Sequence, residues 1–307
     1  MSSCAKVTAV VAAYRRPELL ARLLSSLETE RPALAEVVVV DNGRDLADAV
    51  ARSPVSARRV VPPKNLGCGG GVALGLREAL ANPACTHAWI LDDDASATPG
   101  ALAAMLAALK MGRADAVVPL VVDAEGRIAW FPGPLEAATW AAIRAAGATP
   151  ASVRALGGEV PVPWSWAPWP SLLVTRDAID RAGYPRDDYW FQGEDLEWTL
   201  RLTASGRGVL APAAVCLHTP PAAQDEKRAY RKQLLMLQNN FFTGGLPHGR
   251  RLRRHAAGNV WRTLRAARFT PAAWRDVTLS WWRGAVCGRP AGQAGGDGFR
   301  RAWSDAI

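Results

Sequence analysis

The sequence predicts an α/β fold whose sheet is covered by helices on both faces. Residues 7–12 form an apolar run typical of a strand, and leucines then recur at helical spacing over 19–27. Two further apolar runs, at 37–40 and 88–91, are separated by a helix predicted over 72–80. Continuously apolar strands that alternate with helices are typical of parallel sheets buried on both faces.

Length and composition are those of a globular protein with one substantial core. The chain has 307 residues, of which 49% are hydrophobic and 21% charged. It contains no run of about 18 uncharged apolar residues and does not open with the basic-then-apolar order of a signal peptide. We therefore expect a cytoplasmic protein. The five cysteines are scattered, with no C-x-x-C spacing, and are expected to be free thiols.

Basic residues are concentrated in the last part of the chain. Residues 220–307 hold 16 Lys plus Arg against 5 Asp plus Glu, and their pattern is helical and rich in tryptophan. We therefore predict one domain over 1–220 and a basic helical C-terminal region over 221–307. Basic helices with tryptophans can lie on the anionic inner face of a membrane. Equally, they can pack their tryptophans on the first domain and leave their arginines in water.

Polar clusters follow the predicted strands, at 14–16, 41–44 and 92–94. In open α/β sheets the ligand lies beyond the carboxyl ends of the strands. These clusters are therefore the first candidates for a binding site.

Three consecutive carboxylates, Asp92, Asp93 and Asp94, end one buried strand. Such charges repel one another by about 1 kcal/mol or more per close pair unless a cation lies among them. A divalent ion there, Mn2+ or Mg2+, would neutralise a diphosphate leaving group. His218, which follows the apolar run 215–217, is a candidate third ligand. A solvated acidic turn and a structural histidine are the alternatives.

A second acidic pair, Glu194 and Asp195, stands at a predicted helix start. One of the two carboxylates could be the general base that removes a proton from an acceptor hydroxyl. The alternative is a helix cap, because the helix macrodipole favours negative charge at that end.

Two further segments have both a functional and a structural interpretation. The glycines at 67–71, after Asn65, open a helix and allow a close backbone approach, either by a nucleotide or by a packed neighbour. Trp164, Trp166 and Trp169 lie in a Pro- and Gly-rich stretch. They could stack on the sugar of an acceptor or fill the wall between sheet and loops.

Taken in order, these segments resemble the family 2 glycosyltransferases, and within them the galactofuranosyltransferase and rhamnosyltransferase branch. The resemblance covers roughly residues 7–220. Each motif alone is weak, and the combination is specific. The matching stretches are V-T-A-V-V-A-A-Y-R-R-P from Val7, V-V-V-D-N-G from Val38, N-L-G-C-G-G-G-V-A-L-G from Asn65, W-I-L-D-D-D from Trp89, F-Q-G-E-D-L-E-W from Phe191 and C-L-H-T-P from Cys216.

The resemblance implies a GT-A fold, a Rossmann-like nucleotide-sugar-binding domain with a mixed, mostly parallel sheet, here followed by a helical C-terminal appendage. It also implies inverting, metal-dependent transfer of a sugar from a nucleotide diphosphate to an acceptor hydroxyl. The residues expected around the nucleotide-sugar donor are Tyr14, Arg15, Asp41, Asn42, Asn65, Gly67 and Asp93.

The resemblance also implies roles for the acidic residues. Asp195 would be the general base. Two departures from the family pattern stand out: many members carry asparagine in place of Ala73, and the related branch often reverses the acidic pair, so that Glu194 could be the base instead. The residues expected around the metal are Asp92, Asp94 and His218.

Two rival functions remain open on sequence alone. The basic tail with its aromatics would suit a nucleic-acid-binding protein, although no recognisable module is present. A nucleotidyltransferase would open with a glycine-rich loop after the first strand, where this chain has Ala12-Ala13-Tyr14-Arg15. The expected partners are a UDP- or dTDP-sugar, such as one carrying galactofuranose or rhamnose, and a glycan, a lipid-linked glycan or a small-molecule acceptor.

Overall fold

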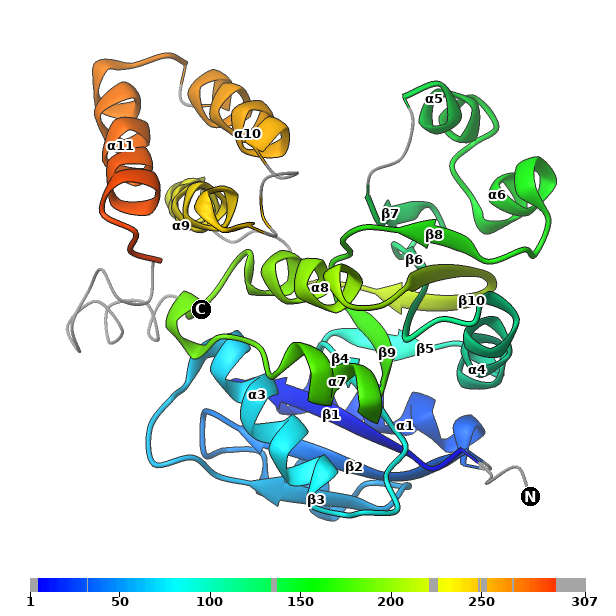
Figure 1. Ribbon diagram of the computed structural model, residues 1–307. Coiled ribbons are helices and arrows are strands. Elements are labelled where there is room, and N and C mark those ends of the chain that lie inside the picture. The colour runs from blue at the N-terminus through cyan, green and yellow to red at the C-terminus, as the bar shows by residue number, and fades with distance from the viewer. Residues whose placement is uncertain are drawn as a thin grey trace. The chain divides into compact units, whose positions relative to one another are not determined.

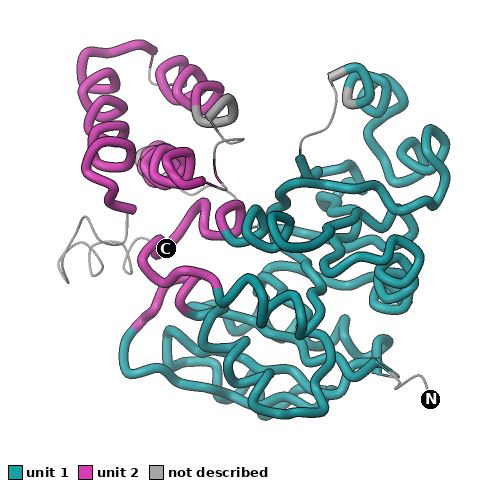
Figure 2. The backbone as a smooth tube through the Cα atoms, viewed as in Figure 1, with its two compact units in different colours: residues 1–64, 71–184, 198–220 teal, residues 65–70, 185–197, 221–307 magenta. Residues whose placement is uncertain are grey.

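The computed structural model describes residues 5–31, 33–133, 137–220, 226–247, 249, 253–266 and 268–290 (Figure 1). The chain divides into two compact units, coloured separately in Figure 2. The first comprises residues 1–64, 71–184 and 198–220, and the second comprises residues 65–70, 185–197 and 221–307.

The first unit is built on a 10-stranded sheet. Along its main path the strands follow the order β3-β2-β1-β4-β9-β6-β10-β5, while β7 pairs with β6 and β8 with β10. The strands are β1 (Val7–Ala13), β2 (Leu34–Asp41), β3 (Ala57–Val60), β4 (His87–Leu91), β5 (Ala95–Ala97), β6 (Ala116–Val122), β7 (Ile128–Trp130), β8 (Val162–Trp164), β9 (Ser171–Thr175) and β10 (Gly208–His218).

The sheet is mixed. Strands β3, β2, β1 and β4 run parallel to one another, and β10 runs parallel to β6. Strand β9 lies antiparallel between β4 and β6, and the short β5 is antiparallel to β10. The predicted α/β fold with a mixed sheet is thus confirmed.

Helices cover both faces of the sheet. Leu20 of α1 and Leu102 of α4 share one hydrophobic core with Val11 of β1. Side chains alternate along a strand, so Val10 points to the other face, where an added Cβ at Gly75 of α3 would meet its Cγ1 at 2.4 Å. The helices that belong wholly or partly to this unit are α1 (Pro17–Ser26), α2 (Ala47–Ala51), α3 (Gly67–Leu80), α4 (Ala101–Gly112), α5 (Ala137–Ala145), α6 (Pro150–Gly157), α7 (Arg176–Ala182) and α8 (Glu194–Ala204).

The second unit is largely helical. Leu237, Leu264, Ala273 and Val277 form its apolar cluster, drawn from three helices. Among the described helices none is long and apolar enough to cross a membrane. The helices of residues 226–290 in the second unit are α9 (Glu226–Gly245), α10 (Arg253–Ala266), α11 (Pro271–Trp281) and the π-helical continuation Trp282–Val286. Residues 221–225 and 291–307 of the predicted C-terminal region lie outside the described residues.

Candidate active site

A tight turn places the three aspartates at the end of β4. The Asp92 N–H donates to the Pro170 carbonyl at 3.2 Å, and the Ala95 N–H donates back to the Asp92 carbonyl at 3.1 Å. The chain then enters β5, which pairs with the end of β10 so that Ala95 stands opposite His218. This pairing brings a histidine from late in the sequence to the aspartate turn.

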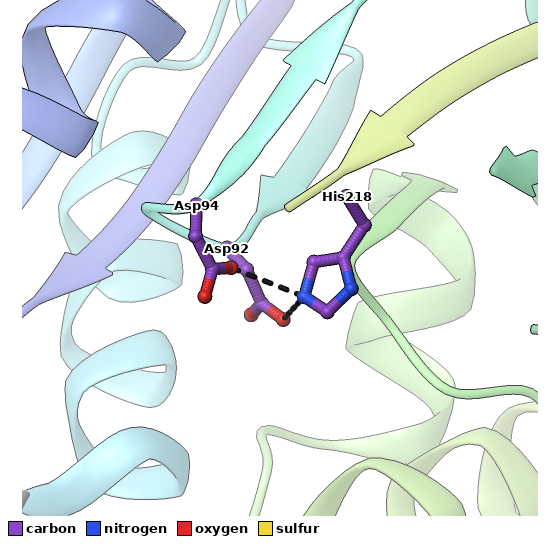
Figure 3. Close-up of side chains that lie close together, drawn as sticks. All are labelled: Asp92, Asp94 and His218. Carbon is purple, nitrogen blue, oxygen red and sulfur yellow. Dashed lines mark ion pairs between the residues drawn. The ribbon is translucent and has the colours of Figure 1, made fainter. Parts of the chain in front are cut away.

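Asp92, Asp94 and His218 gather at one point (Figure 3). His218 Nε2 lies 3.1 Å from Asp94 Oδ1 and 3.9 Å from Asp92 Oδ2. One potential ligand atom from each residue lies within 4.8 Å of the other two. Asp94 and His218 are buried, whereas the Asp92 side chain keeps 32% of its exposure. Two carboxylates and an imidazole converging at this range form a donor set that could hold a divalent metal ion.

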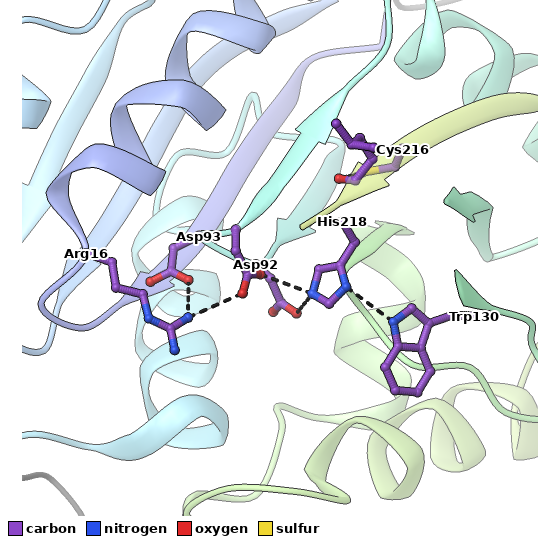
Figure 4. Close-up of polar contacts among 8 residues, drawn as sticks. Arg16, Asp92, Asp93, Trp130, Cys216 and His218 are labelled. Carbon is purple, nitrogen blue, oxygen red and sulfur yellow. Dashed lines mark hydrogen bonds and ion pairs between the residues drawn. The ribbon is translucent and has the colours of Figure 1, made fainter. Parts of the chain in front are cut away.

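Arg16 ties two of the aspartates together (Figure 4). Its Nη1 lies 3.1 Å from Asp93 Oδ1 and 3.3 Å from Asp94 Oδ2. Burial raises the pKa of Asp93 to about 6, an effect that Arg16 opposes and that the charge of Asp94 reinforces. Burial also acts to raise the pKa of Asp94, but hydrogen bonding and charge from His218, with the charge of Arg16, outweigh it, so this pKa is lowered. Sequence reasoning selected Arg15 and missed Arg16.

Trp130 is a second neighbour that sequence reasoning missed. Its Nε1–H donates to His218 Nδ1 at 3.3 Å, and the two rings meet edge to face (Figure 4). An imidazole that accepts at Nδ1 carries its proton on Nε2, facing Asp94. An ion bound at Nε2 requires the opposite tautomer, with the proton on Nδ1. That proton would then face the indole N–H.

The residues predicted to line the nucleoside pocket lie at the ends of β1 and β2. The Arg15 guanidinium lies 5.1 Å from the centre of the Tyr14 ring. Asp41 is fully buried, and its Oδ1 accepts the backbone N–H groups of residues 43, 44 and 45, while Oδ2 accepts that of residue 46. The carboxylate of Asp41 thus shapes the loop after β2. Asn42 is buried beside it and donates its N–H to the Ala13 carbonyl at 3.0 Å.

Asn65 and Gly67 lie in the second unit. The Asn65 side chain accepts the Gly67 N–H at 2.8 Å. Gly67 has a φ of +71°, and a Cβ at this position would meet the Trp190 carbonyl oxygen at 2.3 Å. The close backbone approach expected at this glycine is therefore made by a segment of the chain itself.

Glu194 and Asp195 occupy the first turn of α8. Burial, reinforced by the charge of Asp195, raises the pKa of Glu194 to about 8. Burial also raises the pKa of Asp195 to about 6, although backbone N–H groups, including that of Leu196 at 2.8 Å, favour its ionised form. Burial thus raises the pKa of both carboxyl groups, and raises that of Glu194 further than that of Asp195.

The three tryptophans predicted to bind acceptor differ in exposure. Trp164 and Trp169 are buried, the first against Gly208 and the second edge-to-face on Trp198 at 5.8 Å. Trp166 is half-buried and packs on Gly133. Of the three, Trp166 retains the most surface for stacking.

The sequence of this chain is similar to those of known glycosyltransferases. The family model for glycosyl transferase family 2 matches residues 8–163. Galactofuranosyltransferase GlfT1 of Mycobacterium tuberculosis is 29% identical over 230 residues, which is 72% of this chain and 71% of the relative. GlfT1 of Mycolicibacterium smegmatis is 30% identical over 229 residues, 72% of each chain.

Solved structures share the fold at low sequence identity. S. aureus TarS 1-349 superposes with a TM-score of 0.59 at 14% identity, covering 93% of this chain and 81% of TarS. Mannosyltransferase PcManGT from Pyrobaculum calidifontis, solved with GDP-Man and Mn2+, gives a TM-score of 0.57 at 19% identity, covering 99% and 84%. The match to the family model, extending over half of the chain, identifies this protein as a member of glycosyl transferase family 2, a glycosyltransferase of the GT-A fold.

Proposed function

We propose that this glycosyltransferase is metal-dependent and inverting, and that it takes its sugar from a nucleoside diphosphate. The observation that carries the proposal is the convergence of Asp92, Asp94 and His218 at the end of β4. The Mn2+ named with the PcManGT structure and with GalNAc-T7, which has a TM-score of 0.54, supports a divalent ion.

In the proposed reaction each acidic group has one role. Asp92, Asp94 and His218 would hold Mn2+ or Mg2+, which when bound neutralises the charge of a diphosphate leaving group. Asp195 takes the proton of the acceptor hydroxyl while that oxygen attacks the anomeric carbon in line. The bond from that carbon to the diphosphate oxygen breaks in the same step. One displacement with no covalent sugar-enzyme intermediate inverts the anomeric configuration.

We infer the roles of Glu194 and Asp195 from their pKa values. A general base must be ionised before it can accept a proton. Because the pKa of Asp195 is raised only to about 6 and that of Glu194 to about 8, Asp195 meets this requirement near neutral pH. We assign Asp195 as the base and Glu194 as its protonated neighbour.

For the donor we propose UDP-galactofuranose first and dTDP-rhamnose second, because the similar relatives are galactofuranosyltransferases. UDP-glucose and UDP-N-acetylglucosamine follow. The acceptor we propose is a hydroxyl on a glycan, in the first place one linked to a lipid.

A lipid-linked acceptor suits the surface of the second unit. Trp261, Trp274, Trp281 and Trp282 keep between 46% and 60% of their exposure. Residues 253–290 contain a single acidic residue, Asp276. Exposed tryptophans can insert between lipid headgroups, and neighbouring arginines are attracted to the headgroups when these are anionic. We propose that this region touches a membrane surface.

Calorimetry with a panel of UDP- and dTDP-sugars tests the main proposal. We expect one nucleotide class to bind with Mn2+ present, to bind at least tenfold more weakly without it, and to lose the Mn2+ effect in Asp94→Ala. The charge-preserving Asp123→Glu, at an exposed turn of the same unit, is the control variant. Equal binding with and without Mn2+ by the parent protein would refute metal dependence.

A further inference from the structure

The segment leading into the acidic pair has an unusual backbone. Trp190 has φ +66° and ψ −62°, and the Phe191 N–H donates to the Tyr189 carbonyl at 2.8 Å, which together describe a γ-turn. Gln192 has a φ of +70°. Non-glycine residues in such conformations are strained and persist only where their surroundings hold them.

One buried side chain of α9 holds most of this segment. The Asn239 Nδ2 donates to the carbonyl of Gln192 at 2.6 Å, and it lies 3.3 Å from that of Phe191 and 3.4 Å from that of Tyr189. Asn239 is fully buried. Because the three atoms at this end of the side chain are carbonyl oxygens, the amide must direct its NH2 group towards them. An ionised carboxylate has the same shape but no N–H to donate.

Further contacts hold the first and the central residue of the turn. The Tyr189 hydroxyl lies 2.5 Å from Thr243 Oγ1, one turn along α9 from Asn239. The Cys68 N–H donates to the Trp190 carbonyl at 2.9 Å. Every carbonyl from residue 189 to residue 192 therefore has a hydrogen-bond donor. Asn239 is a donor to three of the four, and for the carbonyls of Phe191 and Gln192 it is the donor that these contacts supply.

The segment also fixes where α8 begins. The Gly193 carbonyl accepts the Glu197 N–H at 3.1 Å, the first bond of the helix. Gly193 has a φ of +91°, and a Cβ added to it would lie 3.3 Å from the Cβ of Asn239. The course of residues 189–193 thus sets the position from which Glu194 and Asp195 project.

We propose that Asn239 is a positioning residue, which holds the strained 189–193 segment and thereby aims the general base. The proposal rests on the assignment of Asp195 as the base. Helix α9 lies beyond the match to the family model. Under this proposal it contributes to the reaction by positioning the base.

The test compares Asn239→Ala and Asn239→Asp with a matched control. Gln238→Ala removes a buried amide from the same helix, one whose Nε2 donates to the Arg289 carbonyl and not to the 189–193 segment. We expect both Asn239 variants to lower kcat by about 10- to 100-fold with donor KM changed less than threefold, because small displacements of a reacting group are costly. The control should keep kcat within threefold.

Hydrogen exchange gives a second measurement that does not depend on turnover. In Asn239→Ser, peptides covering 189–195 should exchange at least tenfold faster than in the parent protein, while peptides from β1 stay unchanged. Unchanged exchange at 189–195, or a kcat within threefold of the parent in Asn239→Ala, would overturn the proposal. A Gln238→Ala variant as impaired as Asn239→Ala would also overturn it, since general packing would then explain both.

Asp195→Asn separates this proposal from the one on which it rests. Loss of turnover in Asp195→Asn with normal turnover in Asn239→Ala leaves the base assignment standing and removes the positioning role. Normal turnover in Asp195→Asn removes the base assignment, and the exchange measurement then still decides whether Asn239 holds the segment.

Discussion

At the scale of single residues, the two members of the acidic pair should behave differently when their charge is removed. Asp195→Asn should lower kcat by at least about 100-fold with donor affinity unchanged, because it removes the proton acceptor. Glu194→Gln should keep kcat within about tenfold, because glutamine resembles the protonated acid assigned to that position. Steady-state kinetics of both variants at pH 7.5 make the measurement. The reverse pattern would make Glu194 the base.

The same assignment predicts how activity depends on pH. Burial raises the pKa of Asp195 to about 6, and the ionised form is the active one. The value of kcat should therefore rise with pH through about 6 and level off above it. A profile measured from pH 5 to 8 in a donor-saturated assay checks this, and a kcat that falls over pH 5 to 7 would contradict it.

Trp130 offers a test of the metal site that needs no turnover. Its indole N–H faces the His218 nitrogen that must carry a proton when the other nitrogen binds an ion. Trp130→Phe removes that opposing donor, and we expect Mn2+ to bind about three- to tenfold more tightly, the worth of one ordinary hydrogen bond. Calorimetric Mn2+ titration makes the comparison, with Trp261→Phe as the exposed control. Weaker Mn2+ binding by Trp130→Phe would mean that the indole supports the metal-bound histidine.

At the scale of elements, the sequence predicts well where the strands end. It predicts poorly which side chains contact the residues at those ends. Apolar runs locate β1, β2 and β4. Arg16, which follows β1, contacts Asp93 and Asp94, which follow β4. Arg16 and Trp130 were missed because their partners lie 77 and 88 residues away in the chain, distances that no local pattern encodes. The three-residue β5, which aligns His218 with the aspartate turn, is too short to be recognised by periodicity.

The direction of a strand could also not be predicted from the pattern of apolar residues. The run at residues 172–174 reads as a buried strand, and the structure places it antiparallel within β9, between β4 and β6. An apolar run buried on both faces has the same appearance in either direction. The role of Asp41 could not be predicted from the sequence either. Its carboxylate accepts four backbone N–H groups that come together only when the loop is folded.

Packing of α3 on the sheet should not tolerate a larger residue at Gly75. A Cβ there would lie 2.4 Å from Val10 Cγ1 and 3.3 Å from Val40 Cγ2. Gly75→Ala should therefore lower the free energy of unfolding by about 1–3 kcal/mol, in spite of the higher helix propensity of alanine. Gly157→Ala, where no atom lies within 4 Å of the added Cβ, is the matched control in urea unfolding. Equal effects of the two variants would contradict this view of the packing.

The N-terminus of α8 should make stability depend on pH. The pKa of Glu194 is raised from its ordinary 4.5 to about 8, mainly by burial, so the folded protein binds this proton more tightly than the unfolded chain does. The resulting stabilisation is present below pH 4.5 and is lost as the pH rises towards 8. Glu194→Gln cannot ionise. We therefore expect it to raise the free energy of unfolding by about 3 kcal/mol more at pH 8.5 than at pH 5.5, measured by urea unfolding. An equal effect at the two pH values would refute this.

At the scale of the whole molecule, charge and function are distributed unevenly. The family model ends at residue 163, within the first unit, whereas the basic surplus lies in residues 220–307. The segment matched by the family model and the basic surplus thus lie in different parts of the chain. If the acceptor is linked to a lipid, as we propose, the exposed tryptophans would meet the membrane surface. If it is soluble, they would have to serve another contact.

Binding to vesicles distinguishes these two cases. We expect the parent protein to sediment with vesicles containing anionic phosphatidylglycerol and to remain in solution with neutral phosphatidylcholine, because arginines near the surface are attracted to anionic headgroups by about 1 kcal/mol each. Binding should weaken as salt shortens the range of that attraction. Trp281→Ser combined with Trp282→Ser should reduce binding at least tenfold, since both indoles are about half exposed. Met111→Ser, at an exposed apolar position of the first unit, should not reduce binding. If the parent protein sediments with neither kind of vesicle, the tryptophans serve a protein contact and the acceptor must be sought among soluble molecules.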